Sequence, residues 1–219
     1  MRKIVLIQLL ALLALISCEE KFEPVVDQGD TEFLPLIIGN YWIYNVDQTI
    51  HFGENDSETE QFFYKDSIRS FYLNAEVEPV YIVERSKSYD RTTWVKELEY
   101  TIHQNKNLLI RTVQNQPMVI LNLPLLNGKV WNGNAFRVAE DDEFELESLA
   151  EDQIRVNQED LDDKITVRDV RYEVFQKQVG LIEKFEDVIT YCSRNDCLGQ
   201  ELIDGGYRQH LTLVDYGKN

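Results

Sequence analysis

Residues 94–102 alternate in polarity with a period of two. Trp94, Lys96, Leu98, Tyr100 and Ile102 fall on one face, and the residues between them fall on the other. This period is that of a β-strand with one buried face, because successive side chains of a strand point to opposite sides. Segment 210–214 alternates in the same way, and segment 41–46 is dense in the aromatic and β-branched residues typical of strands. The sequence therefore predicts β-structure.

Helical signals are weak by comparison. No segment carries an apolar stripe of 3.6-residue spacing over three turns. Segment 143–152 is the best helical candidate, but its first residues alternate equally well as a strand. The apolar parity also changes after Val167, which predicts a bulge or bend at 168–169. We expect a single all-β, mainly antiparallel domain of ten or more strands with at most one or two short helices, built as a curved sheet (half-barrel) or a β-sandwich.

The N-terminus has the pattern of an export signal. Arg2 and Lys3 precede the apolar run 4–16, in which Gln8 is the one polar residue. A spanning helix needs roughly 20 apolar residues, so this run predicts a signal peptide. The sequence Leu15-Ile16-Ser17-Cys18 resembles the lipobox of bacterial lipoproteins, whose cysteine receives a diacylglyceryl group and becomes the new N-terminus. An ordinary secretory signal with a cysteine near its cleavage site is the alternative.

These boundaries divide the chain into a signal peptide (1–17), a flexible tether (18–32) and a β-rich domain (33–219). The formal net charge is −17, and loss of Arg2 and Lys3 with the leader makes it −19. Nucleic acid is not expected as a partner, because phosphate binding needs concentrated positive charge. The expected membrane contact is the lipid on Cys18.

Two further cysteines, Cys192 and Cys197, flank the turn-forming spacer 193–196. In an exported protein an isolated pair favours a structural disulfide. A redox centre is less well supported, since catalytic dithiols usually have a two-residue spacer. Metal binding by the pair is also disfavoured, because no histidine or third cysteine is nearby in sequence.

The remaining chemistry-bearing residues give few signals of catalysis. His51, His103 and His210 are far apart, and no nucleophile elbow, zinc-protease motif or phosphate loop is present. The acidic runs 140–143 and 160–163 offer oxygen ligands to Ca²⁺ but lack the spacing of a calcium loop, so solvated turns are the favoured interpretation. We expect no enzyme activity, no metal and no cofactor.

A candidate ligand-binding patch consists of Trp131, Asn132 and Asn134, which join a flat apolar ring to amides able to pair with sugar hydroxyls. The alternative is that Trp131, like Trp42 and Trp94, is a core anchor. An exposed Trp131 ring would favour contact with a glycan or peptide.

The chain contains one short internal repeat, here called the echoed segments. Residues 34–42 (LPLIIGNYW) match residues 123–131 (LPLLNGKVW) at six of nine positions by chemistry. Proline holds the chain extended, glycine permits a turn, and tryptophan enters the following strand. The repeat indicates either a duplication or a recurrent way of starting a strand.

At segments 33–44, 123–136, 179–184 and 206–217 the chain resembles uncharacterised lipoproteins of the Bacteroidota. The resemblance implies an exported β domain and brings no catalytic residues. Similar valine-glycine-aliphatic edges occur in LolA-like half-barrels, which hold an apolar ligand. Acidic residues after the lipidated cysteine resemble a surface-export signal, which Cys18-Glu19-Glu20-Lys21 fits in part. This favours the outer membrane with the domain facing outwards; the periplasmic face is the alternative.

The functional expectation is a non-enzymatic binding or interaction module whose partner is an envelope protein, a glycan or an apolar ligand. The second hypothesis is a half-barrel carrier or chaperone of an apolar molecule. The third is a polysaccharide hydrolase, which would need two facing carboxylates and an exposed tryptophan.

Overall fold

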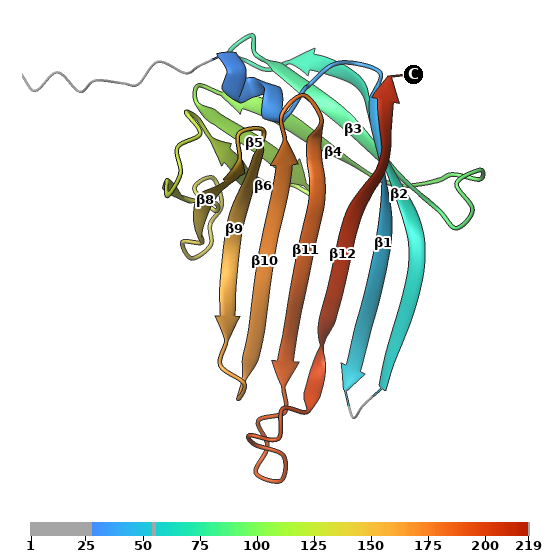
Figure 1. Ribbon diagram of the computed structural model, residues 1–219, viewed down its shortest axis with the longest axis vertical. Coiled ribbons are helices and arrows are strands. Elements are labelled where there is room, and N and C mark those ends of the chain that lie inside the picture. Colours follow the sequence, from blue (N-terminus) through green and yellow to red (C-terminus); the bar gives the residue numbers. More distant parts are fainter. Residues whose placement is uncertain (1–27, 54–55, 219) are drawn as a thin grey trace, which may run out of the picture.

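A computed structural model describes residues 28–53 and 56–218, which form one twelve-stranded antiparallel sheet and one short 3₁₀-helix (Figure 1). The elements are η1 (Gln28–Phe33), β1 (Asn40–Gly53), β2 (Asp56–Leu73), β3 (Pro79–Ser88), β4 (Val95–Asn105), β5 (Leu108–Val113), β6 (Gln116–Asn122), β7 (Val130–Asn132), β8 (Glu143–Ala150), β9 (Gln153–Asp162), β10 (Val167–Gln176), β11 (Gly180–Tyr191) and β12 (Ile203–Lys218). The all-β, antiparallel prediction is confirmed.

The strands follow one another around a nearly closed, barrel-like sheet. The strand order is β6-β5-β4-β3-β2-β1-β12-β11-β10-β9-β8-β7, so the first and last strands pair at the centre. The two ends of the order, β6 and β7, meet through the backbone: Val119 N, on β6, donates to Gly133 O at 2.9 Å. The curved-sheet alternative is therefore correct, and the β-sandwich is wrong because all strands belong to one sheet.

Strand β8 shows why the segment with a period of two forms a strand and not a helix. Phe144 and Leu146 are completely buried, whereas Glu143, Glu145 and Glu147 are exposed. A helix would have placed these five residues around most of its circumference, with no common apolar face. The helical candidate at 143–152 is thus a strand and a turn.

Two details of the strand predictions are wrong. The sheet pairs Arg168 and Asp169 regularly with both neighbours, and the shift of β10 against β9 comes between Arg171 and Tyr172. Trp94 precedes β4 instead of belonging to it, and a register shift against β3 separates Lys96 from Leu98. Bulges depend on the partner strand, so the parity of one strand does not locate them.

The echoed segments have the same local structure. Gly39 and Gly128 both have positive φ, at 92° and 76°. Each glycine N–H donates to the second strand of its half, Gly39 to Ile68 O at 2.9 Å and Gly128 to Leu146 O at 2.7 Å.

The side chains that follow these glycines also correspond. Asn40 Nδ2 donates to Pro35 O, and Lys129 Nζ donates to Pro124 O, both at 3.1 Å. Each segment thus starts a run of six strands, which supports the interpretation as a duplication.

The folded part begins within the segment expected as tether. Glu32 O accepts a hydrogen bond from Gln178 N at 2.8 Å, and Asp30 Oδ2 accepts one from Leu125 N at 2.9 Å. The signal peptide, Cys18 and the first part of the tether lie outside the described residues. Within the described part of the chain, no helix has the length and apolarity needed to cross a membrane.

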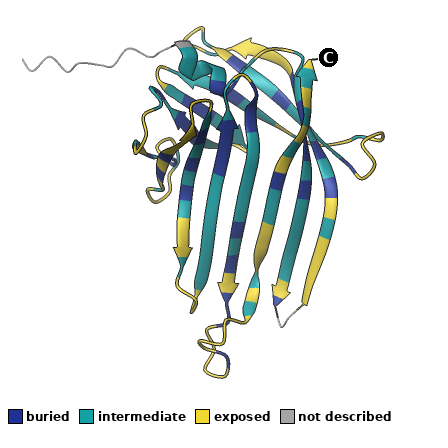
Figure 2. Ribbon diagram, viewed as in Figure 1, coloured by how far each residue is buried: buried dark blue, intermediate teal, exposed yellow. Residues whose placement is uncertain are grey.

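The core fills the inside of the curled sheet. Val46, Leu121, Phe144, Val156 and Leu211 are completely buried there, on strands from all round the sheet. In Figure 2 burial is densest toward the end of the sheet that carries η1, whereas the opposite ends of the long strands are more exposed. Segment 28–39 covers the η1 end and contributes Phe33 and Leu34 to the core.

Candidate functional site

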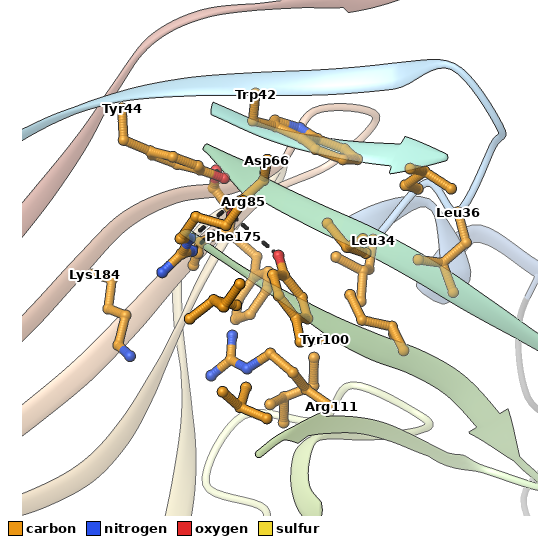
Figure 3. Close-up of a pocket in the computed structure, with 17 residues that line it drawn as sticks. Leu34, Leu36, Trp42, Tyr44, Asp66, Arg85, Tyr100, Arg111, Phe175 and Lys184 are labelled. Atoms are coloured by element: carbon orange, nitrogen blue, oxygen red, sulfur yellow. Dashed lines mark hydrogen bonds and ion pairs between the residues drawn. The ribbon is translucent and has the colours of Figure 1, made fainter. Parts of the chain in front are cut away.

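A cavity of about 140 Å³ lies inside the sheet beneath segment 34–36 (Figure 3). Leu34, Leu36, Trp42 and Ile68 belong to its apolar wall. The indole of Trp42 is held by a 2.6 Å hydrogen bond from Nε1 to Val179 O. The opposite wall is polar, which gives the cavity an amphipathic lining.

The first polar group is an ion pair between neighbouring strands β2 and β3. Arg85 Nε and Nη2 donate to the two carboxylate oxygens of Asp66 at 2.7 and 2.6 Å. The Tyr100 hydroxyl donates to Asp66 Oδ2 at 3.0 Å. The Arg85 guanidinium also lies 4.7 Å from the ring centroid of Tyr64, a cation–π contact. These contacts hold Arg85 in one orientation.

A second pair crosses the interior. Arg111, on β5, donates through both terminal nitrogens to the carboxylate of Glu173, on β10. Lys184 Nζ, on β11, lies 3.9 Å from Glu173 Oε1 and 3.1 Å from Glu186 Oε1. Strands that are distant in the chain thus meet at one buried carboxylate.

The cations, and not the carboxylates, dominate the cavity wall. Three cationic side chains line it, Arg85, Arg111 and Lys184, against one acidic side chain, Asp66. The side chains of Asp66 and Glu173 are 2% and 1% exposed, compared with 14–20% for the three cations. Glu173 therefore lies behind Arg111 and Lys184, whereas Asp66 lines the cavity beside Arg85, and both carboxylates orient their cationic partners. Each of the three cations is paired with a carboxylate, so the wall presents cationic N–H groups whose charge is balanced by their partners.

The pKa values follow from this arrangement. Burial lowers the pKa of the Arg111 guanidinium, but the charge of Glu173, the hydrogen bond that Arg111 donates to Glu173 and the charge interaction with Tyr100 together raise the pKa overall. Burial raises the pKa of Glu173, yet Arg111 and Lys184 together leave it below its ordinary value. Burial and Asp66 raise the pKa of the Tyr100 hydroxyl. Both members of the Arg111–Glu173 pair are thus charged, and Tyr100 is neutral, near pH 7.

The cavity adjoins a surface groove of about 370 Å³. Leu34 and Leu36 line both spaces and form the wall between them. Pro79 and Tyr81, at the start of β3, belong to the far side of the groove. Segment 34–36 therefore separates the cavity from the groove.

The side chains of the predicted patch around Trp131 are used in local packing and hydrogen bonding. The Trp131 side chain is 7% exposed, and its Nε1 donates to Val119 O at 2.9 Å. Asn132 Oδ1 accepts from the backbone N–H groups of Asn134 and Asp142 at 2.8 and 3.1 Å. Asn134 Nδ2 donates to Glu140 O at 2.9 Å. Trp131 is a strand anchor and the amides organise the following loop, so an exposed glycan platform is not formed here.

The expected disulfide is present. Cys192 and Cys197 are bonded, with their Cα atoms 5.8 Å apart, and both are buried. The bond closes the start of the loop between β11 and β12, at the end of the sheet opposite η1. The disulfide is far from the cavity, and its position in this loop fits a structural role.

The histidines lie on β1, β4 and β12; β1 pairs with β12, but His51 is opposite Gly206 and His210 is opposite Asp47. Asp163 accepts hydrogen bonds from the backbone N–H groups of Ile165, Thr166 and Val167 and so organises the turn before β10. No group of three or more metal-ligating side chains occurs in ranges 28–53 and 56–218. Of the acidic run 160–163, residues 160–162 end strand β9 and Asp163 begins the turn before β10, so the expected turn is only partly correct.

The sequence reasoning missed the cavity residues. Asp66, Arg85, Arg111, Glu173 and Lys184 lie on five different strands. The alternation gave no signal for Glu173: Tyr172 and Val174 share the apolar parity, so position 173 falls on the face where a polar residue is expected. In a chain with 39 acidic residues, a carboxylate on that face is not distinctive.

Comparison with known proteins gives distant structural similarity only. No family model matches the sequence, and no curated protein matches it. A crystal structure of a candidate exported protein with a YmcC-like fold, from Bacteroides fragilis, matches with a TM-score of 0.46 and 8% identity over 85% of this chain and 99% of that chain. A candidate lipoprotein from Parabacteroides distasonis matches with a TM-score of 0.45 and 9% identity over 84% and 98%. Similarity at this level assigns neither a family nor a function.

Proposed function

We propose that this chain is a lipid-anchored envelope protein that binds a small anionic amphiphile in its central cavity and does not transform it. The leader and Cys18 support the anchor, and the residues after Cys18 favour the outer surface of the outer membrane. The binding role rests on one observation: three cations line an otherwise largely apolar cavity, and of the carboxylates paired with them only Asp66 lines it.

The cavity volume limits the size of the ligand. About 140 Å³ is close to the roughly 150 Å³ cavity that accommodates benzene in an engineered protein interior. A short acyl chain with a carboxylate fits this space better than a complete membrane lipid. The proposal therefore favours a binding module over a carrier of whole lipids.

Calorimetric titration of the purified protein with octanoate and with 1-octanol tests this function. The two probes share an acyl chain and differ in charge, so octanoate is expected to bind at least tenfold more tightly, the effect of about 1.4 kcal/mol from one charge-assisted contact. Lys184→Met should remove most of this preference. Lys96→Met is the matched control, because Lys96 is a surface lysine that also pairs with glutamates.

A double variant avoids the ambiguity of leaving a buried charge unpaired. Arg111→Met combined with Glu173→Met replaces the whole buried pair by apolar side chains, a change that often leaves stability unaltered. It should bind 1-octanol as before and octanoate about tenfold more weakly. Equal affinity of the native protein for both probes, or binding of neither, would contradict the proposal.

A further inference from the structure

The end of the sheet that carries η1 exposes several large apolar side chains, here together called the η1-end surface. It consists of loop residues Ile37 and Ile38 and of Leu73 and Val77 at the hairpin between β2 and β3, with exposures of 50, 44, 55 and 70%. Ile37 and Pro79 line the same groove, and Leu73 pairs with Pro79 across the hairpin. Figure 2 shows exposed stretches along the loops at this end.

Val77 is held in an unfavourable conformation. Its φ is +65°, in the left-handed region that β-branched residues rarely adopt. Asn74 fixes the hairpin: its Oδ1 accepts from the backbone N–H groups of Glu76 and Glu78, at 3.1 and 2.8 Å. An apolar side chain is thus projected rigidly into solvent at a position where glycine or asparagine would be less strained. Such departures from local preference are concentrated at functional sites.

The chain leads from this surface to the anchor. Gln28, the first described residue, begins η1, and Thr31 and Glu32 of η1 line the same groove as Ile37. Cys18 precedes Gln28 by ten residues, which span at most about 35 Å when fully extended. The far end of the sheet also exposes apolar residues, Phe52 among them, but the length of the long strands separates it from Gln28 (Figure 1).

We propose that the η1-end surface contacts the lipid bilayer that holds Cys18, with Val77 and Leu73 inserted at the level of the headgroups. This inference rests on the lipid anchor of the proposed function and is independent of the cavity ligand. Apolar tips gain free energy in roughly the outer 5–10 Å of a bilayer, which accounts for a strained and exposed valine. The same orientation turns the groove beside segment 34–36 toward the membrane.

Fluorescence quenching in vesicles tests the orientation. Val77→Cys and Phe52→Cys variants of the full lipidated protein are labelled with an environment-sensitive dye without reductant, so that the native disulfide stays closed. The two positions are similarly exposed, at 70 and 59%, and lie at opposite ends of the sheet. On reconstitution in phosphatidylcholine vesicles, quenching by iodide should fall at least about twofold at position 77 and stay unchanged at position 52.

Equal quenching at both positions in vesicle-bound protein would overturn the inference while leaving the anchor intact. Flotation with the vesicles and intact mass report the anchor separately. A protein that carries no acyl group and does not float would overturn the anchor and this inference together.

Discussion

At the scale of single residues, Val77 gives the sharpest stability prediction. A non-glycine residue in the left-handed region is disfavoured by roughly 1–2 kcal/mol, which a glycine avoids. We expect Val77→Gly to raise the free energy of unfolding by about 1 kcal/mol and the melting temperature by about 2–4 °C. Val95→Gly is the control, because Val95 is similarly exposed but lies in a strand, where glycine should destabilise. A lower melting temperature for Val77→Gly would refute the strain argument.

The Glu173 carboxylate predicts a pH dependence of stability. Its folded pKa lies below the ordinary 4.5, so its contribution is complete above that value and is lost as the pH falls through the folded pKa. The free energy of unfolding should therefore fall more steeply on acidification of the native protein than of the Arg111→Met, Glu173→Met variant. Urea denaturation at pH 7 and pH 3.5 gives, for each of the two proteins, the difference in the free energy of unfolding between the two pH values. Equal differences would mean that the pair carries no such linkage.

At the scale of elements, the pairing of β11 with β12 depends on one glycine. Gly206 has a φ of +117°, and a Cβ at this position would lie 2.6 Å from Ile189 Cα and still closer to the carbonyl oxygen of Val188. We expect Gly206→Ala to lower the free energy of unfolding by about 2–4 kcal/mol. Gly199→Ala should cost about 1 kcal/mol, since it also has positive φ but open space around it. Chemical denaturation of the two variants measures the contrast, and equal losses would contradict the steric reason.

The strand predictions succeeded where burial alternates along one strand, and they failed where the partner strand determines the position of a bulge. Phe144 and Leu146 identify β8 because each buried side chain has an exposed neighbour. The bulge between β9 and β10 escaped prediction because its extra residue, Gln158, lies on the partner strand β9, opposite Arg171 and Tyr172. The echoed segments identified both strand starts, yet only the hydrogen bonds of Gly39 and Gly128 gave them a common structural role.

At the scale of the whole molecule, attachment is expected to depend on residue 18. Cys18→Ala removes the thiol that the lipid would modify, so the variant should be released from membranes into the soluble fraction. Two or three acyl chains give nearly permanent attachment, whereas exposed apolar tips alone bind weakly. Fractionation followed by flotation measures the difference. Unchanged membrane association of the variant would show that another contact holds the protein.

The sequence by itself determined the class of structure, the export pattern and the disulfide pair. These depend on local spacing: alternation for strands, the length of the apolar leader, and two cysteines around a turn. The cavity was decided only by the tertiary structure. Arg111 and Glu173 are 62 residues apart, and they meet because the curled sheet brings β5 across from β10. Each of these charges is, along its own strand, indistinguishable from a solvated one, because burial and pairing are properties of the closed sheet.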